Sequence, residues 1–165
     1  SPSLVDAAAA STKEGDMGTA APGVMPYLTV ADGRAALAFY AEVFGARPGL
    51  RLEDPAGKVA HAEMRIGEAI VMLAEPWPEM GISDPRALGG SPVTVALMVE
   101  DVDATVARAA AAGARVLRPP TDEFYGHRAA RIEDPFGHAW YLASVRESLD
   151  DAEIERRWRA MFAPV

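Results

Sequence analysis

The chain has 165 residues, a length that fits one compact domain or two small fused modules. Half of the residues are apolar and 24% are charged, which excludes a disordered chain, and the lack of cysteine excludes disulfides, thiol nucleophiles and zinc fingers. The net charge of −8 argues against nucleic-acid binding. We find neither an apolar run long enough to span a bilayer nor a signal-peptide pattern, so we expect a cytoplasmic protein without membrane contacts.

The N-terminal part of the chain reads as a tail followed by a first module. Residues 1–23 are rich in Ala, Ser, Thr and Gly, and we expect a flexible tail in which residues 4–10 form at most a short helix. Residues 24–76 carry strand and helix patterns in turn. The expected elements are a strand at 25–31, a helix between an N-cap at Asp32 and a C-terminal Gly45, and strands at 50–52, 59–66 and 69–74.

A segment rich in Pro and Gly at 77–92 connects this module to a second one at 93–145. The second module repeats the order of the first, with a strand at 93–99, a helix at 101–112 and strands at 115–118, 127–132 and 138–144. The remaining residues, 146–165, contain a predicted helix that starts at Asp150 and carries an apolar stripe of Ile154, Trp158, Met161 and Phe162. This stripe needs a surface to cover, on its own sheet or on a second subunit.

The recurrence extends to individual residues. Residues 28–32 (LTVAD) match 97–101 (LMVED), residues 45–47 (GAR) match 113–115 (GAR), and His61 with 65–66 (RI) matches His127 with 131–132 (RI). A duplicated β-α-β-β-β module therefore explains the chain. The predicted fold class is α+β, with two tandem modules forming an open half-barrel of mixed sheet and the helices outside.

Five motifs in this order resemble the vicinal-oxygen-chelate superfamily (glyoxalase I, bleomycin-resistance proteins, extradiol dioxygenases), and within it the PhnB-like branch. They span residues 24–144, and the most specific is the turn sequence Asp-Pro-Phe-Gly-His at 134–138. The motifs are PYL at 26–28, AFY at 38–40 with Phe44 and Gly45, HAEMRIG at 61–67, VEDVD at 99–103 and DPFGHAW at 134–140.

The resemblance implies a particular place for a metal. Enzymes of this superfamily hold a divalent ion through four inward-facing positions, in the first and last strands of each module. In this chain those positions are Met25, Met72, Thr94 and Tyr141. Zinc and manganese prefer imidazole and carboxylate ligands, which none of these side chains supplies. We therefore expect no metal and no other cofactor.

Strand alternation predicts which side chains face the cavity of the half-barrel. The opposite phase, for example Met64, Leu97 and Trp140, is apolar and should lie under the helices. The candidate ligand-binding residues are Met25, Tyr27, His61, Glu63, Met72, Thr94, His127, Arg131 and Tyr141.

Most of these residues have a structural alternative. His61 and His127 are either site residues or strand histidines bonded to a neighbouring strand, and the methionines either contact ligand or fill the core. For Glu63 and Arg65 we favour an ion-pair network, with each other or with Arg131. His138 and Trp158 read as structural; Trp77 and Met80 read as a lid or as surface packing. Tyr141 is the favoured ligand contact, because a central-strand tyrosine needs a partner for its hydroxyl.

The sequence thus predicts a metal-independent small-molecule binding protein that sequesters or carries a hydrophobic or cationic metabolite or antibiotic. The alternative is a lyase or isomerase that uses His61, Glu63, His127 or Tyr141 as acid–base groups. A conventional metal enzyme and a purely structural dimerisation module fit less well. We also expect a homodimer, the commonest symmetric assembly.

Overall fold

The computed structural model describes residues 23–163, and the predicted tail therefore lies almost entirely outside the described residues. The chain divides into two compact units. The first unit runs up to Pro92 and also takes in the turn Pro135–His138. The second unit comprises Val93–Asp134 and the chain from Ala139 onward. Within the described part, no helix is long and apolar enough to cross a membrane.

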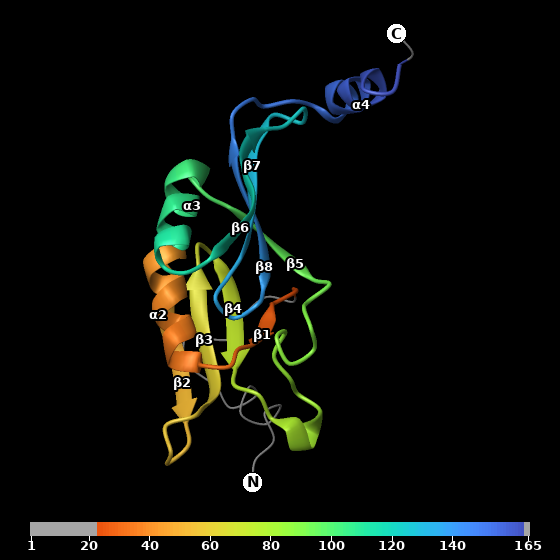
Figure 1. The fold of residues 1–165 in the computed structure, drawn as a ribbon. Coiled ribbons are helices and arrows are strands. Elements are labelled where there is room, and N and C mark those ends of the chain that lie inside the picture. Colours follow the sequence, from red (N-terminus) through yellow and green to blue (C-terminus); the bar gives the residue numbers. More distant parts are fainter. Residues whose placement is uncertain (1–22, 164–165) are drawn as a thin grey trace. The chain divides into compact units, whose positions relative to one another are not determined.

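The first unit is a four-stranded mixed sheet with one helix (Figure 1). Its strand order is β1-β4-β3-β2, in which β1 and β4 are parallel and the other pairs are antiparallel. The helix begins behind the side chain of Asp32, which accepts from the backbone N–H of Ala35, and it ends at Gly45 in the left-handed conformation. The elements are β1 (Tyr27–Thr29), α2 (Gly33–Phe44), β2 (Arg47–Glu53), β3 (Val59–Ile66) and β4 (Ala69–Ala74).

The core of the first unit lies between α2 and the sheet. Tyr40 and Leu73 are fully buried there, and the start of α2 is so close to β3 that a Cβ on Gly33 would lie 2.6 Å from the Cβ of Val59. The turn between β7 and β8 completes this core, because the ring of Phe136 packs against that of Tyr40 at 6.2 Å. His138 Nε2 donates to the carbonyl of Thr29 at 2.8 Å, the structural role that the sequence indicated.

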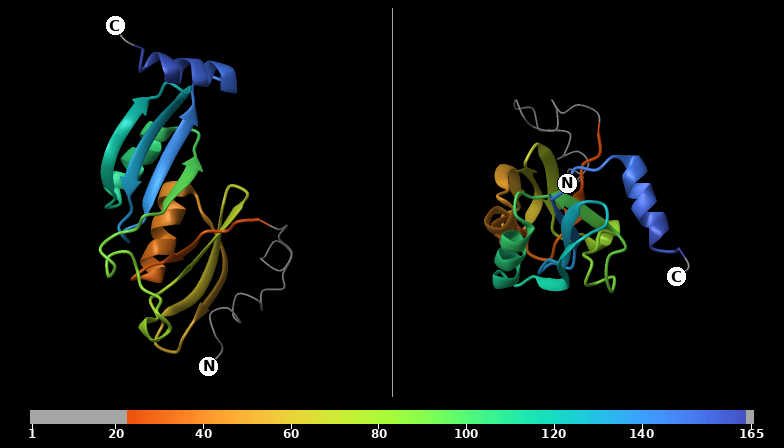
Figure 2. Two further views of the ribbon diagram at one scale, coloured as in Figure 1. Left: turned by 90° about the vertical axis from the view of Figure 1, so that its right-hand side faces the viewer. Right: turned by 90° about the horizontal axis from the view of Figure 1, so that it is seen from above.

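The second unit repeats the architecture. Its sheet has the order β5-β8-β7-β6, with β5 and β8 parallel, and α3 covers one face (Figure 2). Trp140, Ile132 and Leu142 are fully buried beneath α3. The elements are β5 (Thr94–Met98), α3 (Val102–Ala111), β6 (Arg115–Asp122), β7 (His127–Glu133) and β8 (Ala139–Val145).

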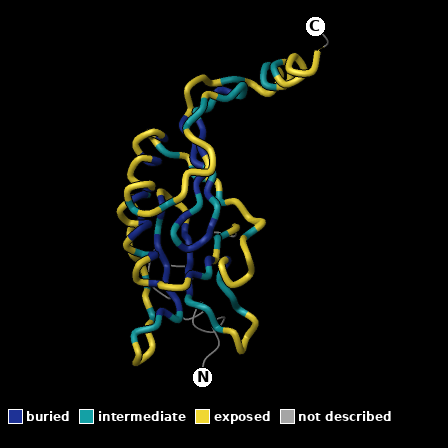
Figure 3. The backbone as a smooth tube through the Cα atoms, in the orientation of Figure 1, coloured by how far each residue is buried: buried dark blue, intermediate teal, exposed yellow. Residues whose placement is uncertain are grey.

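The helix α4 (Asp151–Ala160) follows the second sheet, and the short 3-10 helix η2 (Pro78–Met80) lies in the connecting segment. Asp150 caps α4 by accepting from the backbone N–H of Glu153 at 2.8 Å. No residue of α4 is buried (Figure 3). The predicted apolar stripe is therefore left largely in solvent, with Trp158 50% and Phe162 66% exposed.

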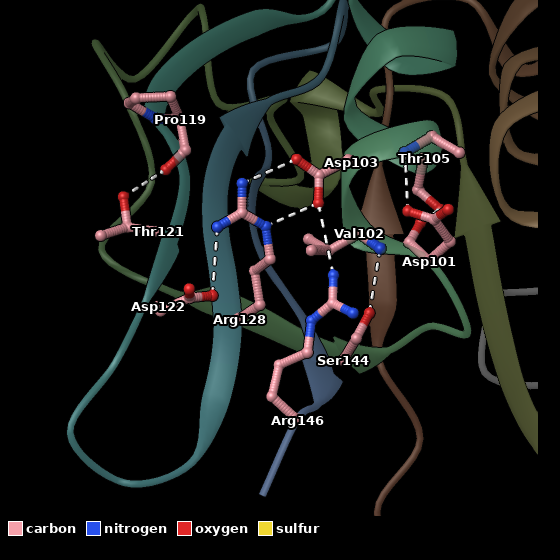
Figure 4. A network of polar contacts seen from close by, with 11 residues as sticks. Asp101, Val102, Asp103, Thr105, Pro119, Thr121, Asp122, Arg128, Ser144 and Arg146 are labelled. Carbon is pink, nitrogen blue, oxygen red and sulfur yellow. Dashed lines mark hydrogen bonds and ion pairs between the residues drawn. The ribbon is translucent and has the colours of Figure 1, made fainter.

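An ion-pair network joins α3 to the second sheet (Figure 4). Arg128 of β7 donates two hydrogen bonds to Asp103 on α3, at 2.6 and 2.9 Å, and a third to Asp122 of β6 at 3.1 Å. Arg146 lies 3.8 Å from Asp103 on the other side. The two hydrogen bonds to Asp103 hold the start of α3 against β7, and the bond to Asp122 joins β7 to β6, so these contacts serve the fold.

The sequence predicted the order of the elements correctly but misplaced several strand ends. The first strand is only Tyr27–Thr29, although Pro26 and Val30 still exchange ladder bonds with β4. The second strand of the second module extends through two prolines to Asp122, which an edge strand with bulges tolerates. Each module also forms a sheet of its own.

One residue correspondence of the repeat was wrong. Met72 and Tyr141 occupy the same position in the last strands of the two modules. Glu63 is opposite Met72 and Arg131 is opposite Tyr141, so Glu63 and Arg131 are the equivalent positions. The match of His61 with His127 is therefore displaced by two residues. A shift of two keeps a side chain on the same sheet face, so the predicted alternation is unaffected.

Candidate functional site

On the sheet face of the first unit opposite α2, three predicted site residues form a hydrogen-bonded chain. The Tyr27 hydroxyl lies 2.8 Å from Nδ1 of His61, and Nε2 of His61 lies 3.3 Å from Oε1 of Glu63. The two ring nitrogens of His61 thus lie within hydrogen-bonding distance of the Tyr27 hydroxyl on one side and of the Glu63 carboxyl group on the other. Within residues 23–163, the expected ion pair of Glu63 with Arg65 does not form, and the Glu63 carboxyl group pairs with His61 instead.

Tyr27 is the exposed end of these hydrogen-bonded side chains, and the other two members are buried. Tyr27 is 43% exposed, whereas His61 and Glu63 are 0% and 4% exposed. Burial, and secondarily the negative charge of Glu63, raises the pKa of Tyr27 above its ordinary value. The phenol therefore remains protonated at neutral pH and presents a hydroxyl group that is tied to a buried histidine and carboxylate.

Glu63 also borders a cavity of about 470 Å³ at the edge strand β2. A bulge in β2 between Pro48 and Arg51 creates this space, and a Cβ on Gly49 would approach the carbonyl of Glu63 to 3.1 Å. Leu37 of α2 lines the same cavity.

The two methionines of the first unit lie close to this chain of polar groups. Met72 of β4 is 7% exposed, and it is directly opposite Tyr27 on one side and Glu63 on the other. Met25 precedes β1 and is partly exposed. Both thioethers can contact a ligand or pack against the sheet, and the geometry is compatible with either role.

The open face of the second unit carries an aromatic group. The hydroxyls of Tyr125 and Tyr141 lie 2.8 Å apart, and the Tyr125 ring meets the His127 ring edge-on at 5.4 Å between centroids. Burial and the bond to Tyr141 raise the pKa of Tyr125 well above its ordinary value. The hydroxyl group of Tyr141 thus has a hydrogen-bond partner, as expected for a tyrosine on a central strand.

Arg131 and Thr94 are brought together on the same face. The guanidinium of Arg131 donates to Oγ1 of Thr94 at 3.2 Å, reaching from β7 across β8 to β5. In the ladder Thr94 is opposite Ala139 and Arg131 is opposite Tyr141, so this hydrogen bond runs diagonally across β8. Thr94 and Arg131 are both exposed.

Sequence reasoning missed Tyr125. It lies in the connection before β7, to which no element was assigned. The available signal was its position two residues before His127, which suggests a shared sheet face if the strand pattern is continued backwards. Trp77 and Met80 belong to the connecting segment, where Trp77 pairs with Ile82 and lies under the ammonium group of Lys58.

The residues at the four expected metal positions do not fit a divalent cation. They offer two thioethers, a hydroxyl bonded to Arg131 and a phenol bonded to Tyr125. Among residues 23–163 there is also no group of three or more His, Asp or Glu side chains arranged to hold a metal ion. The chain lacks the donor set that the superfamily's metal enzymes use.

Two β-α-β-β-β modules, each a mixed sheet with a helix on one face, define a duplicated α+β architecture. The model of the Glyoxalase/Bleomycin resistance protein/Dioxygenase superfamily matches residues 21–142. The chain belongs to this superfamily, as the sequence motifs indicated.

Relatives and solved structures agree with this membership. Uncharacterized proteins of Mycobacterium tuberculosis (strain H37Rv) and Mycobacterium bovis are 41% identical over 137 residues, which is 81% of this chain and 81% and 90% of theirs. TioX from Micromonospora sp. ML1 is 28% identical with a TM-score of 0.59, covering 76% of this chain and 99% of TioX. The fosfomycin resistance protein FosX from Listeria monocytogenes shares the fold at 16% identity, with a TM-score of 0.58 over 82% of this chain and 99% of FosX.

Proposed function

We propose that this protein binds a small organic molecule on its open sheet faces without using a metal ion. The observation that carries the proposal is the replacement of all four expected metal ligands by Met25, Met72, Thr94 and Tyr141. Side chains of this kind offer apolar area and isolated hydrogen-bonding groups, which is the composition of a small-molecule site.

The ligand class follows from the same side chains. Met72 and Tyr141 supply polarizable and aromatic surface, and the Tyr27–His61–Glu63 chain supplies a hydroxyl backed by a carboxylate. Such a surface suits a hydrophobic metabolite or antibiotic with a few polar groups, and the carboxylate of Glu63 accommodates a cationic one. Fosfomycin resistance proteins occur among the proteins of this fold, so antibiotics belong among the compounds to be tested.

One observation favours a second candidate, a metal-independent lyase or isomerase. A phenol bonded to a buried histidine, which is bonded in turn to a buried carboxylate, is an arrangement that can pass a proton to or from a substrate. In this alternative Tyr27 is the group at the reacting atoms and His61 sets its protonation state. The two candidates differ in whether the bound compound is converted.

The test is isothermal titration of the purified protein against a panel of metabolites and antibiotics, together with metal analysis. For a compound that binds, Tyr141→Ala should lower the affinity about five- to hundred-fold, because it removes roughly 1–3 kcal/mol of apolar contact and hydrogen bonding. Trp140→Ala is the matched control, since its side chain is on the opposite face of the same strand. Where that variant folds, its affinity should stay within about twofold of wild type.

Three results would reject the proposal. They are a panel without any binder, an affinity that does not respond to Tyr141→Ala, and a stoichiometric transition metal that survives dialysis and depends on His61 or His127. Conversion of a bound compound by metal-free protein, abolished in His61→Gln and in Tyr27→Phe, would instead establish the acid–base alternative.

A further inference from the structure

Two arginines lie directly opposite each other on the open face of the second unit. Arg131 of β7 pairs with Arg118 of β6 in the antiparallel ladder, and both side chains are exposed. Residues directly opposite share a sheet face, and like charges in this arrangement repel. A chain with a net charge of −8 has many carboxylates that could relieve the repulsion. The partners of the two arginines therefore decide what this face can bind.

The carboxylates on this face are already engaged. Arg118 pairs with Glu123 at 2.6 Å, and Glu133, the neighbour of Arg131 on the same face, pairs with Arg115 at 3.1 Å. Within residues 23–163, the recorded polar contact of the Arg131 side chain is the single hydrogen bond to Thr94. A guanidinium has five N–H donors. Arg131 is thus held in place while most of its donors face solvent.

An apolar aromatic surface adjoins these donors. Tyr141 is directly opposite Arg131 in the ladder, and Ala96 is directly opposite Tyr141 on its other side. The bond to Tyr125 fixes the Tyr141 ring, and the alanine is too small to cover it. On β5, the exposed side chain of Met98 extends the apolar surface.

We propose that the open face of the second unit binds a planar aromatic compound that carries a carboxylate group. Arg131 receives the carboxylate through two parallel N–H donors, and the aromatic ring lies against Tyr141 over Ala96. This inference rests on the proposed binding function and specifies its ligand class. It also predicts that the local charge, and not the overall charge of the chain, selects the ligand.

The probes are naphthalene-2-carboxylate and naphthalene-2-carboxamide, which share a ring system and differ in charge. Full-length protein is titrated with each probe by calorimetry and by NMR of the arginine side chains. The variant is Arg131→Gln, and its matched control is Arg108→Gln, which makes the same change in charge on the exposed side of α3. Thermal melts confirm that both variants fold.

We expect wild-type protein to bind the carboxylate at least about tenfold more tightly than the amide, as for one charge-assisted hydrogen bond. Arg131→Gln should lose this preference and leave the amide affinity unchanged, and Arg108→Gln should keep it. Rising salt concentration should weaken only the carboxylate complex. The NMR signal of the Arg131 side chain should shift with the carboxylate probe.

Equal affinities for the two probes, a preference that survives Arg131→Gln, or no binding of the carboxylate at millimolar concentration would overturn the inference. Different results would reject the proposed binding function itself. If both probes bind equally and Tyr141→Ala weakens both, the open face binds ligands without selecting anions, and only the inference is wrong. If no compound of any charge binds, the proposed function is wrong as well.

Discussion

Tyr27 shows how burial, and secondarily a neighbouring carboxyl group, changes the chemistry of a partly exposed side chain. Burial and the charge of Glu63 raise its pKa, so the folded protein holds the phenolic proton more tightly than the unfolded chain does. The corresponding stability is fully present below the unfolded pKa of about 10, and it is lost as the pH rises through the higher folded pKa. We expect Tyr27→Phe to reduce the alkaline loss of stability, measured by denaturant unfolding between about pH 8 and pH 11. An unchanged pH dependence would contradict this assignment.

Trp140 and Tyr141 are neighbours in sequence with opposite surroundings. Trp140 is 1% exposed, and its Nε1 donates to Asp134 at 2.8 Å, whereas Tyr141 borders open space. Trp140→Ala should therefore lower the free energy of unfolding by about 3–5 kcal/mol. Tyr141→Ala should cost about 1 kcal/mol, the value of one hydrogen bond. If chemical denaturation gives the reverse order, the assignment of side chains to the two faces is wrong by one residue.

At the scale of elements, α4 depends on ion pairs because it buries nothing. Glu153 accepts from both Arg156 and Arg157, and Arg157 also binds Glu147 and the carbonyl of Phe124. The two guanidinium groups lower the pKa of Glu153 to about 2. A depressed carboxylate pKa means that this contribution is present above the unfolded pKa of about 4.3 and is lost as the pH falls towards 2.

We accordingly expect the backbone amides of α4 to stay protected from hydrogen exchange near pH 4 and to lose protection as the pH approaches 2. Glu153→Gln should remove the protection at every pH and leave the sheets unchanged. Glu155→Gln is the control, because within residues 23–163 the ion-pair partner of Glu155 is the exposed Arg159 on the same helix. Equal effects of the two variants would show that the anchor through Arg157 does not hold the helix.

The helices were the elements most readily predicted, because local side chains set their ends. Asp32, which the sequence predicted as an N-cap, accepts from the backbone N–H three residues later, and Asp101 and Asp150 at the predicted starts of the other two helices do the same. Strand ends depend on partners far away in the chain. Pro119 and Pro120 read as a stop signal, yet β6 continues through them because an edge strand does not need every donor.

For the whole molecule, the expected homodimer remains a prediction, and its candidate interface is the set of exposed side chains Trp158 on α4 and Met161 and Phe162 just after it. We expect sedimentation at tens of micromolar to show a dimer, and Trp158→Asp combined with Phe162→Asp to shift it towards a monomer. The stability of each unit should not change, because these side chains are outside both cores. A wild-type monomer at that concentration would refute the dimer.

The sequence by itself determined the duplicated module, the superfamily, the order of the elements and the alternation of faces. All of these follow from local patterns: caps, turns and the two-residue period of a strand. Tertiary structure alone decided which side chains meet. The chain Tyr27–His61–Glu63 joins β1 to β3, and Tyr125 reaches Tyr141 from a connection without a strand pattern. The tertiary structure also showed that Glu63 in the first module corresponds to Arg131 in the second. Ladder pairing, and not residue similarity, decides which positions of the two modules correspond.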